Sequence, residues 1–355
     1  MNAPSWRDSV VLRWMLAALG LVLALSVTQE LARPETTDLI SAGTAESTLR
    51  RAVPILLAGL GGIWAERAGV VNIGLEGMMI LGTWFGAWGA LEFGPWWGMA
   101  IGAAGGAAGG LLHAVATVGF GVDHIISGVA INILAPALTR FLSREVFADR
   151  PGGGITQSPR VESVSSVDLP FVSGGDLLGW TTPDLFGWAA DRGWFLVSDL
   201  SALLSGITSS LSWATVLALA LVPASVIVLW RTRLGLRIRS AGEHPVAADS
   251  LGINVYRVKA LAVVVSGGLA GFGGAFIAIE QTGIYREAQV QGRGFIGLAT
   301  VIFGNWQPVG AFLGSMLFGF ADALQLRDRT AVHALLLLVG VALAALAVRA
   351  VLRRR

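Results

Sequence analysis

The chain contains no cysteine among its 355 residues. This absence excludes a disulfide framework, a thiolate nucleophile and any cysteine-based metal or iron–sulfur site. Lysine is nearly absent as well, since Lys259 is the only one. No G-x-x-x-x-G-K-[ST] string surrounds that lysine, so the chain has no phosphate-binding P-loop of its own. Any energy from ATP would therefore have to come from a partner protein.

Charged residues are also scarce. They make up 14% of the chain, against 54% hydrophobic residues, whereas a soluble domain carries about 25% charged residues. The apolar residues come in many windows of about 20, each long enough to cross a hydrocarbon core about 30 Å thick. Because backbone polar groups in lipid must be satisfied internally, we predict an all-α, polytopic membrane helical bundle. The whole chain, 1–355, is expected to form a single transmembrane domain.

Histidine is the third scarce residue type, with four in the chain. No two of them have metal-ligand spacing such as H-x-x-x-H, and no clustered His/Asp/Glu constellation suggests a membrane-embedded enzyme. The net charge of +2 is small and the arginines are dispersed, which gives no sign of nucleic-acid binding. We therefore predict no catalytic residues, no metal site and no cofactor held by this chain.

Ten segments are predicted to span the membrane, with boundaries good to a few residues. The first could instead be a signal peptide, because Arg7 and Arg13 precede its apolar run, but no small-residue cleavage site follows it. The predicted spans are 10–31, 50–66, 70–91, 96–118, 122–143, 211–230, 257–280, 293–304, 308–325 and 331–351.

The distribution of charge sets the expected orientation of these spans. The connection 144–210 carries more acidic than basic residues, whereas 231–259 is strongly basic, and cytoplasmic loops usually carry the Lys/Arg excess. We therefore expect 144–210 to be an extracytoplasmic loop region and 231–259 to be cytoplasmic. Ten spans then place both termini in the cytoplasm, provided that 293–325 is split into two spans at the string NWQP.

A weak internal repeat fits this architecture. The string GLGG at residue 59 and the string GFGG at residue 271 are each followed by a polar break. Gly77 or Gly294 then starts an apolar run that ends near a tryptophan. The two copies start five predicted spans apart, so they would be inverted, as in many transporters. Chance similarity between glycine-rich spans is the alternative.

A further glycine-rich run, GAAGGAAGG at 102–110, is predicted to be a close helix-packing face. Small residues let membrane helices approach one another. No phosphate-binding helix start follows the run, so a nucleotide-binding loop is not indicated.

A short cytoplasmic helix is predicted in the string GEHPVAADSLGI. Pro245 suits a first helical position, and Gly252 suits the residue after a helix end. Ala247, Ala248 and Leu251 would form a small apolar face. Such a helix offers one rigid knob to a soluble partner, although a merely solvated loop helix would show the same local pattern.

Three strings in the same order resemble one family of proteins: ERAGVVNIGLEGMM, GEHPVAADSLGINV and GRGFIGLATVIFGNW. They resemble the integral membrane permeases of ATP-binding-cassette (ABC) importers, in the branch that serves ribose-type sugars, branched-chain amino acids and nucleosides. The chain is most similar to the nucleoside permease subunits, from about residue 50 to 350. The loop 144–210 and the first 35 residues match no motif of the family.

The resemblance implies that 243–252 is a cytoplasmic coupling helix with an Ala-Ala-x-x-x-Gly motif that docks into the ATPase subunit. Val246 stands where the family usually has an acidic residue. The implied coupling residues are Glu243, His244, Pro245, Ala247, Ala248, Leu251 and Gly252.

Polar residues inside the spans are the candidates for a substrate pathway. A charged side chain costs about 2.5 to 3.5 kcal/mol at the bilayer centre and tends to face a cavity. The resemblance places Asn72 and Glu76 beside the translocation path, although Glu76 could instead be a satisfied interhelical group. Glu66 and Arg67 are expected to pair with each other or to face the cytoplasm. The predicted pathway residues are Asn72, Glu76, Asn132, Glu280, Gln291, Asn305 and Trp306.

The resemblance implies a permease subunit of an ABC importer, multi-pass in the cell (inner or plasma) membrane, with nucleosides as the expected substrate. The implied partners are two cytoplasmic ATPase subunits, a second permease that is identical or related, an extracytoplasmic binding protein, a small-molecule substrate and the lipid bilayer. ATP would be used by the partner subunits. A permease for sugars or branched-chain amino acids is the nearest alternative, and an ion-coupled secondary transporter, which would need no coupling helix, is the second.

Overall fold

The computed structural model describes residues 41–168, 174–177, 180–192, 194 and 197–325. The predicted spans 10–31 and 331–351 lie outside these residues. The chain divides into two compact units, and the larger one comprises Leu49–Ser166 and Ser212–Gly319. The described part of the smaller unit falls within 41–48, 167–211 and 320–325.

The described residues are predominantly α-helical, as predicted, with strands of only two residues each. The helices are α2 (Ala42–Arg67), α3 (Leu75–Phe93), α4 (Pro95–Ala114), α5 (His124–Val146), α6 (Leu185–Ala190), α7 (Val197–Thr208), α8 (Trp213–Arg231), α9 (Arg233–Glu243), α10 (Pro245–Ser250), α11 (Val255–Phe276), α12 (Arg293–Phe303) and α13 (Pro308–Gln325). Two π-helical segments, Val115–Gly119 and Ile277–Gln281, extend α4 and α11. The strands are β1 (Ser166–Val167), β2 (Asp176–Leu177), β3 (Trp180–Thr181) and β4 (Leu211–Ser212), of which β2 and β3 pair antiparallel.

Four helices of the described residues are long and apolar enough to cross a membrane: Pro95–Gly119, His124–Val146, Trp213–Arg231 and Val255–Gln281. The shorter apolar helices are Val197–Thr208, Arg293–Phe303 and Pro308–Leu324. The predicted break at NWQP is present, because α12 ends at Phe303 and α13 begins at Pro308. The chain is thus an all-α helical membrane protein, and the count of ten spans remains a prediction.

The predicted loop region 144–210 contains elements that the sequence analysis did not assign. Helix α6 and the apolar α7 lie within it, together with β1, β2 and β3. With 12 residues, α7 is shorter than the windows of about 20 residues that identify a membrane span. The extracytoplasmic position of this region is still a prediction.

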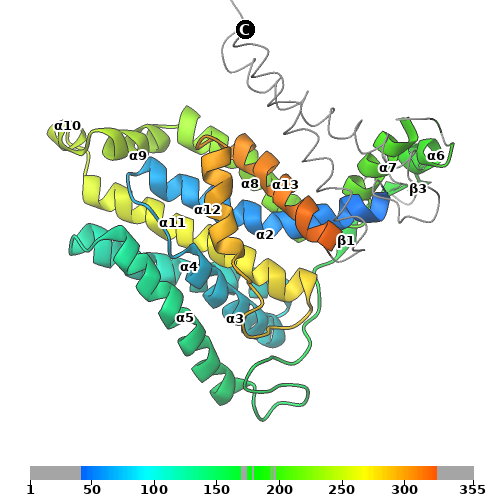
Figure 1. Ribbon diagram of the computed structural model, residues 1–355, viewed down its shortest axis with the longest axis horizontal. Coiled ribbons are helices and arrows are strands. Elements are labelled where there is room, and N and C mark those ends of the chain that lie inside the picture. The colour runs from blue at the N-terminus through cyan, green and yellow to red at the C-terminus, as the bar shows by residue number, and fades with distance from the viewer. Residues whose placement is uncertain (1–40, 169–173, 178–179, 193, 195–196, 326–355) are drawn as a thin grey trace, which may run out of the picture. The chain divides into compact units, whose positions relative to one another are not determined.

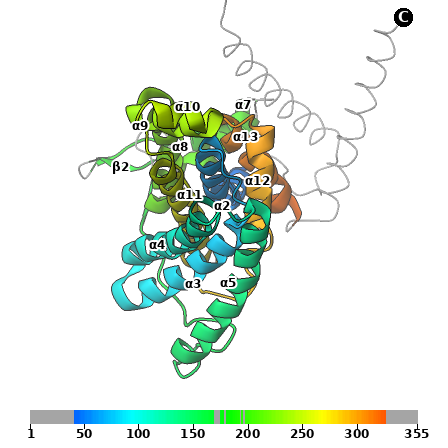
Figure 2. The same ribbon diagram turned by 90° about the vertical axis from the view of Figure 1, so that its left-hand side faces the viewer.

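Helix α2 runs through the middle of the larger unit (Figure 1, Figure 2) and buries nearly every side chain from Ala52 to Ala65. Helices α3, α4 and α11 pack against one another most extensively. At one end of the larger unit lie α9 and α10, while the last residues of α5 extend toward the other (Figure 1).

Glycines bring α4 and α11 into backbone contact, as the run 102–110 predicted. A Cβ atom added at Gly106 would lie 2.3 Å from the carbonyl oxygen of Gly267, and one at Gly271 would lie 2.5 Å from that of Gly102. A Cβ atom added at Gly82 of α3 would lie 2.1 Å from the carbonyl oxygen of Gly271. Such close approach is how membrane helices gain van der Waals contact where lipid removes the hydrophobic driving force between them.

Several helices of the larger unit, α5, α8, α9 and α11, begin at a cap supplied by the side chain of the residue just before them. The Asp123 side chain accepts hydrogen bonds from Ile125 N (2.9 Å) and Ile126 N (3.1 Å) at the start of α5. Ser212 and Asn254 cap α8 and α11 in the same way. By contrast, α3 and α12 follow Gly74 and Gly292, which have no side chain to cap with. Their first N–H groups need acceptors from elsewhere in the chain.

We predict that Gly271→Ala lowers the thermal unfolding midpoint of the detergent-solubilised protein, because the new methyl would press on the backbone of α4. Overpacking of this kind costs about 1–3 kcal/mol. Gly268→Ala on the same helix is the matched control, since its nearest neighbour would be the Ala107 Cβ at 3.7 Å. Scanning fluorimetry compares the two variants, and equal midpoints would contradict the close packing of α4 and α11.

Candidate functional site

The carboxylate of Glu76 caps the beginning of α12. Its Oε1 accepts a hydrogen bond from Gly292 N at 2.8 Å, and its Oε2 accepts one from Gly294 N at 2.7 Å. A negative charge is favoured there because the unpaired amides of a helix start carry a partial positive charge. A Cβ at Gly294 would lie 2.5 Å from the Glu76 Cα. Only glycine therefore allows this approach without displacing the backbone.

The side chain of Asn132 caps the beginning of α3. Its Oδ1 accepts a hydrogen bond from Gly77 N at 2.8 Å, and its Nδ2 donates to the carbonyl oxygen of Ile73 at 3.0 Å. The side chain comes from the middle of α5, so it ties α5 to the irregular segment that joins α2 to α3. The structure thus brings Glu76 and Asn132 together at the starts of two helices.

Asn72 lies in the same irregular segment and is completely buried. Its Nδ2 donates to the Ser266 hydroxyl of α11 at 2.9 Å and lies 3.3 Å from the Met78 sulfur. Its Oδ1 has no hydrogen-bond partner among the described residues. Ser266 is a residue that the sequence analysis missed, because a single serine in an apolar span carries no local signal of its partner.

Glu280 lies away from this pair of caps, whereas Gln291 immediately precedes Gly292, whose N–H donates to Glu76. The Glu280 carboxylate accepts a hydrogen bond from Val164 N at 2.8 Å, which ties the end of the π-helical segment to the chain that follows α5. Gln291 is exposed and has a φ of 55° in the loop 282–292. Left-handed backbone is uncommon for a residue with a side chain, so the loop is held in this shape by its surroundings.

Asn305 and Trp306 occupy the break between α12 and α13, with φ angles of 50° and 54°. The Trp306 indole N–H donates to the Glu66 carboxylate, and Arg67 donates to the Trp306 carbonyl oxygen at 2.9 Å. Glu66 and Arg67, which were expected to pair with each other or to face the cytoplasm, thus both contact Trp306. The eleven residues of α12, about 16 Å of helix, separate Trp306 from Glu76.

The Arg67 side chain connects this break to the helices around it. Its guanidinium lies 5.2 Å from the ring centroid of Trp230 in α8, within cation–π range. A Cβ at Gly242 would lie 2.4 Å from the carbonyl oxygen of Arg67. The end of α2 thus contacts the last turn of α9, three residues before α10 begins.

The predicted coupling segment divides between two helices. Glu243 ends α9, His244 joins them, and α10 runs from Pro245 to Ser250. Gly252 has a φ of 80° and follows the end of α10. This left-handed conformation is the usual reason for glycine after a helix end.

The three apolar residues of α10 and its end do not share one face. Ala248 is buried with 2% of its surface exposed, whereas Ala247 is exposed and Leu251 is 82% exposed. The expected shared face is split because Ala248 packs against the rest of the protein. Val246, which is 81% exposed, lies on the outer surface instead. The outward apolar surface is therefore formed by Val246, Ala247 and Leu251, and we call it the α10 knob.

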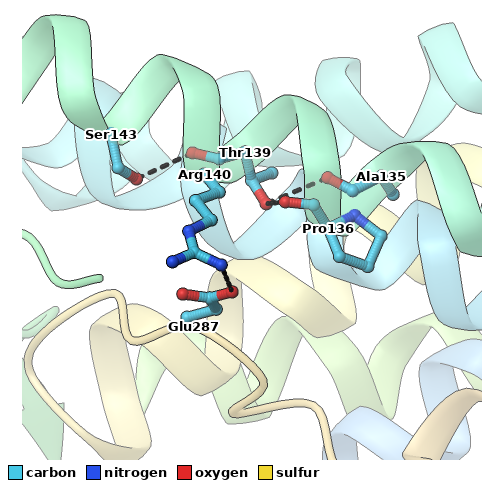
Figure 3. Close-up of polar contacts among 6 residues, drawn as sticks. All are labelled: Ala135, Pro136, Thr139, Arg140, Ser143 and Glu287. Carbon is cyan, nitrogen blue, oxygen red and sulfur yellow. Dashed lines mark hydrogen bonds and ion pairs between the residues drawn. The ribbon is translucent and has the colours of Figure 1, made fainter. Parts of the chain in front are cut away.

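An ion pair joins α5 to the loop 282–292 (Figure 3). Arg140 Nη1 lies 3.8 Å from Glu287 Oε1. Next to Arg140 on α5, the Thr139 and Ser143 hydroxyls donate to carbonyl oxygens of their own helix. The sequence analysis missed both charged residues, although an arginine inside the predicted span 122–143 was a signal that could have identified one of them.

Comparison with known proteins places this geometry in context. The family model of the branched-chain amino acid transport system permease component matches residues 44–341. The guanosine ABC transporter permease protein NupQ of Bacillus subtilis is 36% identical over 287 residues, covering 79% of this chain and 81% of the relative. The nucleoside ABC transporter permease protein NupC of Lactococcus lactis is 38% identical over 280 residues, covering 76% and 78%.

Two further relatives bear on substrate and assembly. A putative glucose ABC transporter permease protein of Haloferax volcanii, TsgC13, is 34% identical, covering 82% of this chain and 79% of the relative. A second guanosine ABC transporter permease protein of Bacillus subtilis, NupP, is 24% identical and covers 78% and 71%. No solved structure gives a significant match.

We predict that Glu76→Ala lowers the unfolding midpoint strongly, because two N–H groups at the start of α12 lose their acceptor. An unsatisfied buried N–H costs about 1–3 kcal/mol. Glu92→Ala, at the other end of α3, is the matched control. Its carboxylate lies 2.5 Å from Arg150 in an exposed ion pair, and exposed pairs contribute about 0–1 kcal/mol. Scanning fluorimetry on the purified protein should separate the two, and similar shifts would rule out a capping role.

Proposed function

The chain belongs to the family of branched-chain amino acid transport system permease components, and on that premise we propose that it carries nucleosides as the permease subunit of an ABC importer. The observation that supports this substrate is the similarity to NupQ and NupC, which are named for guanosine and nucleosides. The chain is a transporter component rather than an enzyme. ATP hydrolysis belongs to partner subunits, in keeping with the missing P-loop.

A sugar is the second candidate substrate. TsgC13, at 34% identity, is named as a putative glucose permease. Nucleosides and sugars share hydroxyl groups, which need amide and carboxylate partners, and a nucleoside adds a flat base that aromatic side chains can contact. The higher identity of the two nucleoside permeases favours nucleosides.

The second permease of the assembly is proposed to be a different chain. Bacillus subtilis has two proteins named as guanosine permeases, and this chain is 36% identical to one and 24% identical to the other. Such a difference is expected if the chain is the counterpart of NupQ and its partner resembles NupP. Cytoplasmic ATPases and an extracytoplasmic binding protein complete the proposed importer.

The proposed topology has ten spans in the cell membrane, with both termini in the cytoplasm and an inverted repeat. The separation of α12 from α13 supports the split on which the count depends. The repeat is supported by the two glycines that were matched in the sequence, Gly77 and Gly294. In both, the backbone N–H at a helix start donates to a side-chain oxygen from a different helix.

The proposed mechanism is alternating access driven through α10. The α10 knob would dock into an ATPase, and closure of the ATPases would move α9 and α10 together. The contact of Gly242 with Arg67 provides a path from α9 to α2, and Arg67 and Glu66 extend that path to Trp306 and α12. Motion of α9 and α10 could then be transmitted through α12 to the Glu76 cap. The residues Asn72, Glu76, Asn132, Glu280, Gln291, Asn305 and Trp306 remain proposed pathway residues.

The substrate is tested by uptake in a host that expresses the chain with its ATPase, binding protein and second permease. We expect uptake of labelled guanosine that is lost when the ATPase carries a substitution that prevents ATP hydrolysis. It should persist when an uncoupler removes the proton gradient for a period too short to deplete ATP. Uptake of glucose or leucine but not of any nucleoside would refute the substrate, and dependence on the proton gradient alone would favour a secondary transporter.

We predict that Leu251→Asp weakens binding of the ATPase and lowers ATP-dependent uptake, because a carboxylate would be placed in the apolar α10 knob. Ser250→Asp adds the same charge one residue earlier, at an exposed polar position, and should change both much less. Co-purification of the ATPase with the tagged permease and uptake rates measure the two effects. Unchanged co-purification and uptake with Leu251→Asp would argue against docking through this surface.

A further inference from the structure

Arg140 is an unusual residue for its position. It lies in α5, one of the helices long and apolar enough to cross a membrane, and its side chain is 63% exposed. It lies six residues before the end of α5, about 9 Å along the helix axis. Exposed arginine within a span is costly in lipid, and such residues almost always face a water-filled cavity or the interior of the bundle.

The loop 282–292, which contains Glu287, gives an independent reason to expect water next to Arg140. If α12 and α13 are separate spans, as we propose, then α12 with about 16 Å of helix is too short to cross a core about 30 Å thick. The loop 282–292 must then make up part of the crossing. Irregular backbone at membrane depth is tolerated only where it is buried in protein or lines an aqueous cavity.

This loop is not fully buried. Glu287 is 30% exposed, and both Ala288 and Gln291 are exposed. The backbone of the loop is nevertheless fixed at its middle and at its end, because Glu287 N donates to the Thr156 carbonyl at 2.8 Å and Gly292 N donates to Glu76. A rigid, irregular, partly exposed loop beside an exposed arginine fits the wall of an aqueous cavity and does not fit a lipid-facing surface.

The contact between Arg140 and Glu287 leaves both groups able to bind something else. Their 3.8 Å separation is too long for a hydrogen bond. Among the described residues, neither side chain makes a hydrogen bond that would have to be broken first. Arginine offers paired N–H donors that match the acceptor edge of a purine, and a carboxylate accepts from hydroxyl or ring N–H groups. Phe295, exposed in the first turn of α12, adds an aromatic surface nearby in sequence.

We propose that Arg140 and Glu287 form a substrate-contact site in the outer half of the pathway. A nucleoside replaces their mutual contact, with the guanidinium donating to acceptor atoms of the base and the carboxylate accepting from ribose hydroxyls or ring N–H groups. This site rests on the proposed nucleoside function and assigns residues to it. It lies on the same wall as the Glu76 cap, because the loop 282–292 connects Glu287 to Gly292.

The absence of cysteine in the chain allows a direct test in the reconstituted complete transporter. Arg140→Cys and Glu287→Cys each introduce a single thiol into this subunit, to be labelled with a charged, membrane-impermeant methanethiosulfonate reagent. Phe141→Cys is the matched control, because Phe141 follows Arg140, is 60% exposed and points about 100° away around the helix. We expect labelling at 140 and 287, little labelling at 141, and slower labelling at 140 and 287 when guanosine is present.

Transport kinetics supply a second measurement that does not depend on thiol chemistry. Arg140→Met should raise the KM for guanosine by about tenfold or more, as expected for loss of a charged hydrogen-bond partner. Arg140→Lys should recover part of the loss, since it keeps the charge. If Arg140→Cys does not assemble, Glu287→Cys carries the labelling test against the same control.

The outcomes separate the site from the function. Equal labelling at 140 and 141, or labelling that guanosine does not slow in a transporter that carries guanosine, would overturn the site. A transporter that carries no nucleoside would overturn the proposed function, and the labelling contrast between 140 and 141 would still decide whether Arg140 faces water. An unchanged KM in Arg140→Met would also overturn the site.

Discussion

The carboxylate of Glu76 decides where α12 can begin. A helix that starts inside the protein leaves its first N–H groups without acceptors, and the residue before α12 is a glycine with no side chain to offer. Glu76 satisfies two of these groups at once, at Gly292 and Gly294. The loop 282–292, the close approach of Gly294 and the position of α12 against α3 all follow from that pair of hydrogen bonds. A carboxylate in an oily run is thus a structural requirement of a helix more than 200 residues further along the chain.

The other end of α12 is also held by contacts with residues of other helices. Trp306 and Asn305 adopt left-handed backbone at the break, and Trp306 is bonded both to Glu66 through its indole and to Arg67 through its carbonyl oxygen. Arg67 also contacts Trp230, and its carbonyl lies against Gly242 at the end of α9. Helix α12 is therefore held at both ends by side chains of other elements. Its eleven residues of regular helix connect the break at Trp306, which lies near α9, with the Glu76 cap.

Local patterns in the sequence predicted the parts of the fold that depend on local chemistry. Apolar runs located the helices, Pro245 and Gly252 bounded α10, NWQP marked the break, and the small residues of 102–110 indicated close packing. The sequence could not show that Ala248 is buried while Ala247 is exposed, because that depends on which neighbour α10 packs against. It also could not pair Glu76 with Gly294, Asn72 with Ser266 or Arg140 with Glu287, since each pair joins distant parts of the chain. Helix α7 was missed for another reason, because it is too short to register as a span.

The backbone contact among α3, α4 and α11 limits how this unit can change shape. Where glycines let carbonyl oxygens touch the neighbouring helix directly, there are no flexible side chains to absorb sliding, so these helices must travel as one body. Displacement is left to the irregular segments at 68–74, 282–292 and 304–307. Those joints are held by a few side-chain hydrogen bonds, each of which could be exchanged for another partner. The barrier between two arrangements would then depend on the strength of a handful of polar contacts, and it would respond little to how tightly the apolar interior is packed.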